Sequence, residues 1–249
     1  MNGAESLVRT LVDAGVEVCF SNPGTSEMHF VASLEKVPGM RCVLGLFEGV
    51  VTGAADGYYR IAEKPASTLL HLGPGLGNGL ANLHNAKKAR SGIVNVVGEH
   101  ATHHLQHDAP LTADIAAIAR PMSDWVRTAR DSMSVAADGA AAVAAASSRP
   151  GKIATLIMPA DTAWGEARAS CAPETVPSPP IVSERSIAAA AKALRKGRSA
   201  LLLGGLGTRQ GPLALAGRIS AATNCAVLTE YAVARVERGA GRVEALRLP

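Results

Sequence analysis

A glutamate at the end of a predicted strand is the residue of this sequence best placed to exchange a proton. Glu48 follows the apolar segment Arg41–Leu46 and precedes a run of small residues that begins at Gly49. Open α/β sheets bind ligands at the edge where their parallel strands end. The carboxylate directly follows Phe47, which would remove part of its hydration and suit it to sharing a proton. From spacing alone, a first-turn glutamate that complements the helix dipole is the simpler interpretation.

Polar loops follow three further predicted strands and are expected at the same edge. They are Ser21–Glu27, His71–Asn78 and Gly98–His104. Each could equally be a turn with a helix cap, and Thr25 or Ser26 is the predicted cap of the first loop. Because strands of a parallel sheet end at one edge, these loops and Glu48 are candidates for one site.

Histidines are concentrated in the third loop. Four of the seven in the chain fall between His100 and His107. Imidazoles that converge on a loop can bind a metal ion, but no carboxylate or cysteine accompanies these at a regular helical spacing. We therefore interpret the segment as a mobile, polar active-site loop and predict no metal ligands in the chain.

Short apolar segments alternate with helical segments over the first two thirds of the chain. The predicted strands are Val16–Phe20, Arg41–Leu46, Ser67–Leu72, Ile93–Val97 and Ile153–Met158. The predicted helices are Ala4–Ala14, Ser26–Leu34, Gly49–Ala62, Leu76–Lys88 and Ser132–Ser147, with Gly139 as a weak point in the last. Strands of continuous hydrophobicity are typical of parallel sheets buried on both faces. The order predicts an α/β fold with a doubly wound parallel sheet and helices on both faces.

Prolines mark a change of domain. Residues 1–166 form the first predicted domain, and residues 167–182, which contain four prolines, form a linker. Residues 183–249 start a second, partial α/β domain. Its predicted elements are the helices Ser186–Arg195 and Leu213–Thr223, the strands Ser199–Leu203 and Ala226–Thr229, and the turn Gly204–Gly207.

Composition excludes several classes of protein. With 47% hydrophobic and 18% charged residues, the 249-residue chain suits a packed core. Its net charge of +4 comes from scattered basic residues, which argues against a nucleic-acid partner. It shows no signal-peptide pattern and no apolar stretch that could span a membrane, and its four cysteines are far apart. We therefore expect a cytoplasmic protein without a disulfide framework.

Three segments together resemble the pyrimidine-binding domain of thiamine diphosphate (ThDP)-dependent 2-oxo acid enzymes of the acetolactate synthase and benzoylformate decarboxylase type. They are Asn22–Glu27, Glu48 with Ala54–Tyr58, and Gly73-Pro74-Gly75 with Asn78. Met158–Asp161 is similar to the usual end of that domain. The resemblance covers Gly3–Trp164, and residues 183–249 look like the start of the family's central domain.

The resemblance implies that Glu48 activates the cofactor. In the family, the matching glutamate hydrogen-bonds N1′ of the aminopyrimidine and favours its imino tautomer, which takes the proton from thiazolium C2. The cofactor then serves as electron sink for decarboxylation of a 2-oxo acid, and the product is an aldehyde or an acyloin. By position, the residues that would line the pyrimidine pocket are Pro23, Gly24, Gly73, Pro74, Gly75 and Asn78.

The same resemblance implies four substrate contacts. Thr25 and His71 match a serine and a histidine that contact substrate in benzoylformate decarboxylase, and Thr25 adds one methyl group to that serine. The pair His103 and His104 is similar to the tandem histidines of pyruvate decarboxylases. The Gly73–Gly75 element is closer to the synthases, so carboligation and decarboxylation both stay open.

One family element is missing from this sequence. The family binds the diphosphate and Mg²⁺ through a third domain, which carries a Gly-Asp-Gly element followed by paired asparagines. One subunit's pyrimidine domain faces another subunit's diphosphate domain. We therefore expect this chain to be the amino-terminal part of a longer or split enzyme. It would be inactive without a second copy or a subunit that bears the diphosphate domain.

Three interpretations follow. The first is an acetolactate synthase-like enzyme acting on 2-oxo acids, with a benzoylformate decarboxylase-like enzyme as its alternative. The second is a non-catalytic dimerising or regulatory module, which would have no need for Glu48. The third, a nicotinamide-dependent dehydrogenase, is disfavoured because Gly73-x-Gly75-x-x-Asn78 lacks the third glycine of the fingerprint.

Overall fold

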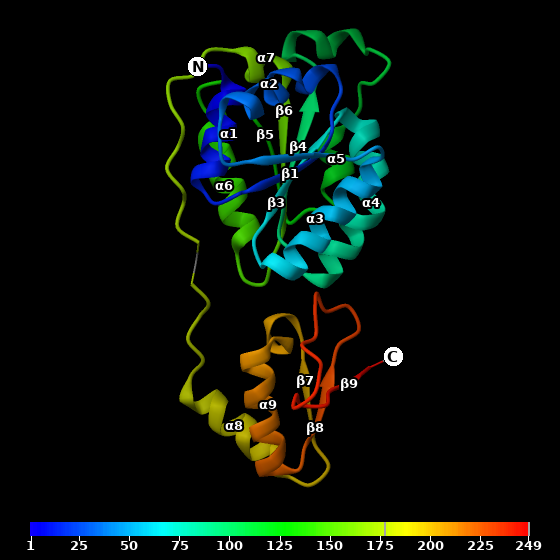
Figure 1. Ribbon diagram of the computed structural model, residues 1–249, viewed down its shortest axis with the longest axis vertical. Coiled ribbons are helices and arrows are strands. Elements are labelled where there is room, and N and C mark those ends of the chain that lie inside the picture. Colours follow the sequence, from blue (N-terminus) through cyan, green and yellow to red (C-terminus); the bar gives the residue numbers. More distant parts are fainter. Residues whose placement is uncertain (177, 249) are drawn as a thin grey trace. The chain divides into compact units, whose positions relative to one another are not determined.

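The computed structural model describes residues 1–176 and 178–248 (Figure 1). The chain divides into two compact units, one of residues 1–87 and 91–177 and the other of residues 88–90 and 178–249. The division falls inside the segment 167–182 that the prolines indicate as a linker. Each unit has a sheet of its own.

The first unit is built on a six-stranded parallel sheet with the strand order β2-β1-β3-β4-β6-β5. Its strands are β1 (Val18–Asn22), β2 (Arg41–Leu44), β3 (Ala66–Leu70), β4 (Ile93–Glu99), β5 (Trp125–Thr128) and β6 (Ile153–Pro159). Every residue of β3, β4 and β6 is buried. Their continuous hydrophobicity therefore reflects burial on both faces, and the predicted doubly wound fold is confirmed.

Helices cover both faces of this sheet, as Figure 1 shows. One face packs against α1 (Gly3–Asp13), α2 (Met28–Lys36), α6 (Val135–Ser147) and the short α7 (Ala160–Trp164). The other face packs against α3 (Glu48–Ala62), α4 (Leu72–Ala89) and α5 (Ile115–Ala119). Two short 3₁₀ helices, η1 (Thr25–Glu27) and η2 (Thr102–His107), follow β1 and β4. No helix among the described residues is both long enough and apolar enough to cross a membrane.

A row of polar side chains crosses the centre of the sheet. Thr68, Asn95 and Thr155 are register partners on β3, β4 and β6 and are fully buried. The Thr68 hydroxyl donates to Asn95 Oδ1 at 2.8 Å, and Asn95 Nδ2 donates to Thr155 Oγ1 at 3.0 Å. Ser123 extends the row, with its hydroxyl 2.7 Å from that of Thr155. The row fixes the register of strands whose ends carry candidate site residues.

Gly139 contributes to packing instead of weakening its helix. A Cβ placed on it would overlap Cδ1 of Leu7, so the missing side chain lets α6 approach α1 closely. Both helices bury their contacting faces in the same core. The close packing of α6 on α1 therefore offsets the free energy that glycine costs in the interior of a helix.

The start of α4 differs from the prediction. The Gly73–Gly75 segment was predicted as a turn between elements, but α4 already begins at Leu72. Pro74 is compatible with a first helical turn, because the amide that it lacks has no partner within the helix there. The reversal from β3 to α4 is made by Leu72, which has a φ of +54° and is buried. β5, α5 and α7 were not predicted, and each has only four or five residues.

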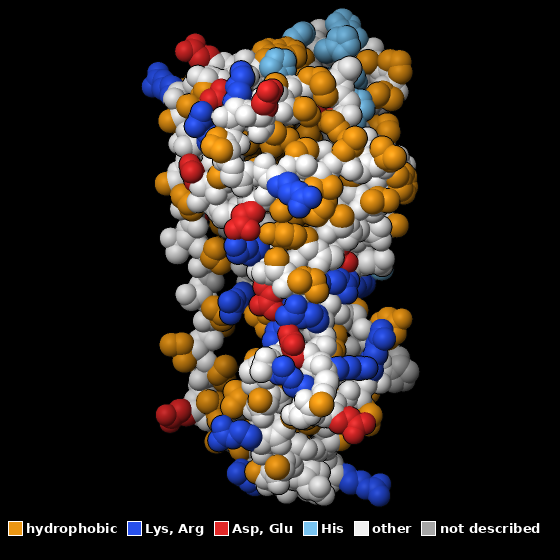
Figure 2. All heavy atoms as spheres, in the orientation of Figure 1, with side chains coloured by type: hydrophobic (Ala, Val, Ile, Leu, Met, Phe, Trp, Pro, Cys, Tyr) orange, Lys and Arg blue, Asp and Glu red, His pale blue; other side chains and the backbone are white. Residues whose placement is uncertain are grey.

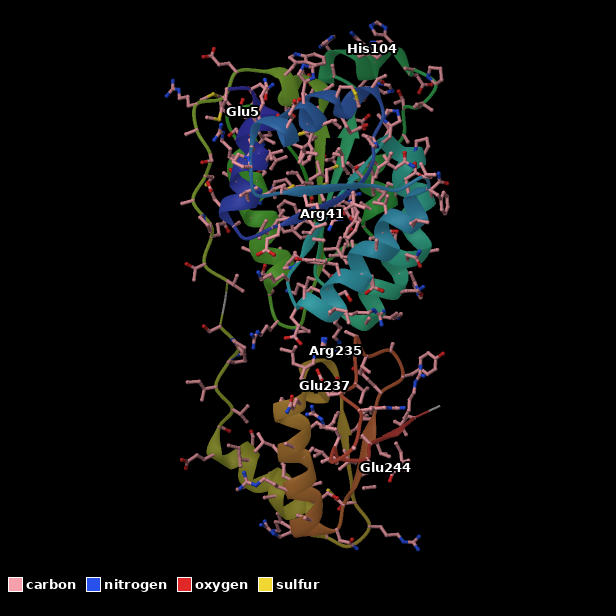
Figure 3. The ribbon with its side chains drawn as sticks, viewed as in Figure 1. Glu5, Arg41, His104, Arg235, Glu237 and Glu244 are labelled. Atoms are coloured by element: carbon pink, nitrogen blue, oxygen red, sulfur yellow. The ribbon has the colours of Figure 1, made fainter. Side chains whose placement is uncertain are left out.

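The second unit is a smaller α/β arrangement. Three parallel strands, β7 (Ala200–Leu203), β8 (Ala226–Thr229) and β9 (Leu246–Arg247), form its sheet. Its helices are α8 (Glu184–Leu194), α9 (Gln210–Thr223) and the short η3 (Gly205–Thr208). A small core forms around Leu213, Ala216 and Val227. Arg235 and Glu237, labelled in Figure 3, form an ion pair at 2.7 Å. The second α/β pattern is confirmed, with β9 as an addition.

Replacing Asn95 with alanine tests the buried polar row. The change would leave the Thr68 hydroxyl without its acceptor Asn95 Oδ1 and would remove the Asn95 donor from Thr155, which keeps only its contact with Ser123. We expect it to lower the free energy of unfolding by about 2–4 kcal/mol in urea titrations. Asn85→Ala, at an exposed position of α4, is the matched control and should change it by less than about 0.5 kcal/mol. Equal effects of the two changes would show that the row does not stabilise the sheet.

Candidate active site

Four polar segments of the first unit begin where parallel strands end. β1 leads into the loop before η1, β2 into Glu48, β3 into His71, and β4 ends at Glu99. In Figure 1 the arrowheads of β4 and β6 point to the end of the unit that carries α2 and α7. The sheet therefore brings together, at one edge, groups that are far apart in the sequence.

Glu48 is the first residue of α3 and is half-buried. Asn78 of α4 donates from Nδ2 to Glu48 Oε2 at 3.0 Å. Among the described residues, none hydrogen-bonds the second carboxylate oxygen, Oε1. Phe47, which was expected to shield this carboxylate, lies with its ring over Gly49 and is 50% exposed. The carboxylate is therefore held on one side by an amide and accessible on the other.

Hydrogen bonds between α3 and α4 hold this glutamate in place. The Thr52 hydroxyl donates to the carbonyl of Gly79 at 3.0 Å and lies 3.1 Å from the carbonyl of Glu48 itself. Asn82 of α4 donates from Nδ2 to the Gly49 carbonyl at 2.6 Å. Thr52 is fully buried, so the first turn of α3 is fastened to the middle of α4.

Gly75 lies between Glu48 and His71. A Cβ built on this glycine would be 3.4 Å from Glu48 Oε1 and 3.5 Å from Cβ of His71. Its amide donates to the His71 carbonyl at 2.8 Å. A larger side chain would fill the space beside the free carboxylate oxygen, so glycine keeps that space open.

His71 is bound to a buried glutamate that the sequence analysis did not single out. Its Nδ1 lies 2.8 Å from Oε2 of Glu27, and the Glu27 side chain is fully buried. The amide of Gly24 donates to the same oxygen at 2.7 Å. A Cβ on Gly24 would overlap the His71 ring, so this glycine allows the histidine to approach the loop.

The same glutamate corrects the predicted helix cap. Neither Thr25 nor Ser26 caps the helix, since η1 begins after Gly24 and has no side-chain cap from that residue. Instead, the carboxylate of Glu27, three residues later, reaches back to the Gly24 amide. This is the glutamate half of a capping box, with glycine in place of the serine or threonine.

Glu27 is electrostatically unusual. Burial raises its pKa, and the hydrogen bonds from the Gly24 amide and His71 oppose that shift. Its second oxygen, Oε1, is buried and has no hydrogen-bond partner among the described residues. That oxygen lies against Gly98, where a Cβ would overlap the carboxylate. Glu27 thus joins the ends of β1, β3 and β4 around one carboxylate.

The histidine loop lies on the surface of the same unit. His103 and His104 are exposed on η2, and Figure 2 shows histidine side chains gathered at that end of the unit. The His104 ring lies 5.5 Å from that of His100 and 5.4 Å from that of His107. Asp161 anchors the loop by accepting from the amide of Thr102 at 3.0 Å. Among the described residues, no hydrogen bond or ring contact joins His103 or His104 to Glu48 or His71.

Metal binding finds no support in this loop. Within residues 1–176 and 178–248, no group of three or more histidine, cysteine, aspartate or glutamate side chains could hold a metal ion. Glu99, next to His100, is buried, and burial raises its pKa. It accepts from the His100 amide at 2.8 Å, which occupies one of its oxygens.

The other predicted site residues differ in their surroundings. Pro23 is half-buried beside Gly24, and Thr25 is exposed as the first residue of η1. Gly73 is buried, and a Cβ on it would come within 2.5 Å of Ala113, so it is also a packing position. Pro74 is exposed on the first turn of α4. The contacts among Gly24, His71, Gly75, Glu48 and Asn78 define the core of the candidate site.

Comparison with known proteins relates the amino-terminal part of the chain to a family. Residues 1–118 match the model of the thiamine pyrophosphate enzyme amino-terminal binding domain. Residues 1–118 of this chain therefore belong to this family of binding domains. A Mycobacterium tuberculosis protein named as a candidate acetolactate synthase large subunit is 55% identical over 243 residues, which are 97% of this chain and 46% of that protein.

Other relatives include decarboxylases. Benzoylformate decarboxylase of Pseudomonas aeruginosa is 33% identical over 112 residues, which are 45% of this chain and 21% of that enzyme. The fold matches that of a ThDP-dependent 4-hydroxybenzoylformate decarboxylase from Rhodococcus jostii, with a TM-score of 0.83 and 22% identity. That match covers 92% of this chain and 44% of the other. The chain thus spans just under half the length of its most extensively matched relatives.

Gly98→Ala tests whether the Glu27 carboxylate holds the three strand ends together. The added methyl group would displace the carboxylate from His71 and the Gly24 amide. We expect the free energy of unfolding to fall by about 2–4 kcal/mol in urea titrations.

Gly77→Ala is the matched control. Gly77 is exposed on α4, and a Cβ there meets nothing within 4 Å. Alanine at this position should be neutral or stabilise by up to about 1 kcal/mol. If the Gly98→Ala chain were as stable as this control, the Glu27 carboxylate would not hold the ends of β1, β3 and β4 together.

Proposed function

We propose that this chain forms the pyrimidine-binding side of a ThDP-dependent enzyme that acts on 2-oxo acids, with Glu48 as the group that activates the cofactor's aminopyrimidine. One observation carries the proposal. Asn78 fixes one oxygen of Glu48, while the other oxygen faces the space that Gly75 leaves open. A carboxylate so placed can accept a hydrogen bond from a ring nitrogen and share its proton.

Glu48, Gly75 and Asn78 form one corner of the site, and the residues around it suit a flat heteroaromatic ring. Gly75 presents backbone where a side chain would block a ring, Gly24 lets the His71 ring approach the loop, and Asn78 orients the carboxylate. Pro23, Gly73 and Pro74 would complete the pocket by their positions at the starts of η1 and α4. ThDP, when bound, supplies an electron sink for the carbon that loses carbon dioxide. Within this chain, the role of Glu48 is to hold a proton at the aminopyrimidine nitrogen.

His71 is proposed to meet the 2-oxo acid, and Glu27 is proposed as its positioning residue. A carboxylate beside Nδ1 keeps the proton on that nitrogen, which leaves Nε2 as the nitrogen available to a ligand. Burial fixes Glu27 in one place, so the imidazole ring is also fixed. Thr25, one residue after Gly24, would add a hydroxyl to the same side. His103 and His104 stay proposed substrate contacts on the exposed η2.

An exposed apolar surface around Glu48 supports a partner domain. Leu44, Leu46, Phe47 and Val50 are 66%, 92%, 50% and 60% exposed, respectively. Clusters of large exposed apolar side chains mark interaction surfaces. We propose that this surface is covered by a diphosphate- and Mg²⁺-binding domain, from a second copy or another subunit. Catalysis would require that domain.

Two activities fit the same corner. The relative matched over 97% of the chain supports an acetolactate synthase-like carboligase. The Glu27–His71 pair and Thr25 favour the alternative, a benzoylformate decarboxylase-like enzyme, because an imidazolium held by Glu27 at Nδ1 could donate its Nε2 proton and so release an aldehyde. Product analysis with pyruvate and with benzoylformate separates them. An acyloin from pyruvate supports the first, and benzaldehyde from benzoylformate supports the second.

Glu48→Gln tests the central role in this proposal. Glutamine keeps the size of the side chain and its bond with Asn78 but removes the carboxylate. In the enzyme that contains this chain and its diphosphate-binding domain, we expect exchange of the thiazolium C2 proton of bound ThDP with deuterium to slow by about 100-fold or more. NMR after acid quench measures this exchange.

Glu35→Gln is the control, because Glu35 is an exposed glutamate on α2. It should leave the exchange rate unchanged. Equal exchange rates in the Glu48→Gln enzyme and the control, with ThDP bound in both, would overturn the assigned role. The absence of ThDP binding in any form of the enzyme would favour the non-catalytic module.

A further inference from the structure

Two cysteines lie side by side on β1 and β2, the neighbouring strands that lead into Gly24 and Glu48. Cys19 of β1 and Cys42 of β2 are register partners in a parallel pair, so their side chains emerge on the same face of the sheet. Both are free thiols; Cys19 is fully buried and Cys42 is exposed on the edge strand. We propose that they form a peroxide-sensitive thiol pair, in which Cys42 is the reacting thiol and Cys19 the resolving thiol.

The surroundings of Cys42 favour a thiolate. The Cys19 side chain beside Cys42 lowers the pKa of the Cys42 thiol to about 6 despite its partial burial, while the Cys19 thiol itself donates to the carbonyl of Phe20 at 3.9 Å. Ser21 contributes further, with its hydroxyl 3.3 Å from Cys42 Sγ. The same arrangement and its own burial raise the pKa of Cys19. Cys42 is thus the exposed thiol with the lowered pKa and Cys19 the buried thiol with the raised pKa, which is the division of roles that a reacting and a resolving cysteine require.

The chemistry needs one hydroperoxide for each pair. The Cys42 thiolate attacks the peroxide, the oxygen–oxygen bond breaks, and sulfenic acid and water form once the leaving oxygen takes a proton. The Cys19 sulfur then displaces the hydroxyl group of the sulfenic acid, and its own proton leaves with a second water. Two thiols are oxidised to one disulfide, and the peroxide is reduced to two molecules of water.

The position of the pair gives the disulfide a structural consequence. β1 continues into the loop that carries Gly24 and Glu27, and β2 continues into Glu48. A bond between Cys19 and Cys42 would tie together the two strands that carry these groups. The inference does not depend on the proposed function, because it concerns the thiols alone.

Treatment of the native chain with hydrogen peroxide, followed by non-reducing digestion and mass spectrometry, tests the pair. We expect a Cys19–Cys42 cross-linked peptide that is about 2 Da lighter than the sum of its two reduced peptides. Cys19→Ser should accumulate a sulfenic acid on Cys42 that dimedone traps. Cys42→Ser should give neither product.

Cys171 supplies the matched control, because it is a free, half-buried thiol of the same unit without a cysteine partner among the described residues. Cys171→Ser should give the same cross-link as the unaltered chain. In the unaltered native chain, iodoacetamide should label Cys42 about 10-fold faster than Cys171, and urea should abolish the difference. This comparison needs no variant to fold. Similar labelling rates in the native chain, or peroxide treatment that yields no Cys19–Cys42 cross-link, would overturn the proposal.

Discussion

The hydrogen bond between Glu27 and His71 is the constraint on which the candidate site depends. It joins the loop after β1 to the end of β3, and the same carboxylate presses against Gly98 near the end of β4. A buried carboxylate oxygen without a hydrogen-bond partner is costly, and Oε1 of Glu27 has none among the described residues. The arrangement therefore points to a role in function. The pair holds the His71 imidazole in one place, beside the open space at Gly75.

Glycines and amides shape the rest of the corner. Gly24 admits the His71 ring, Gly98 admits the Glu27 carboxylate, and Gly75 keeps the space beside Glu48 free. Asn78 of α4 then holds the Glu48 carboxylate, and Thr52 of α3 ties the same helical turn to the Gly79 carbonyl of α4. The arrangement resembles other α/β enzymes in that a rigid sheet supplies the positions and the loops at its edge supply the chemistry. Its open, apolar side around Phe47 is the side that we assign to a partner domain.

The fold was predictable because its signals are local. Continuous hydrophobicity in β3, β4 and β6 indicates burial on both faces, and alternation with helices implies a parallel sheet whose strand ends share an edge. The position of Glu48 at that edge followed from the same pattern. Glu27 could not be assigned from spacing, because its partners His71 and Gly98 meet it only through the strand order of the folded sheet. The helical start at Leu72 was hidden by Pro74, which is as typical of turns as of a first helical turn.

We propose that the corner formed by Glu48, Gly75 and Asn78 binds the aminopyrimidine of ThDP. The most direct test is an NMR titration of the isotopically labelled chain with ThDP, which follows the Gly75 amide and the side-chain amide of Asn78. We expect both signals to shift progressively with ThDP, and we expect Glu48→Gln to weaken the binding by at least about 10-fold. Signals that stay unchanged at millimolar ThDP, or shifts that are identical in the Glu48→Gln chain, would contradict this proposal.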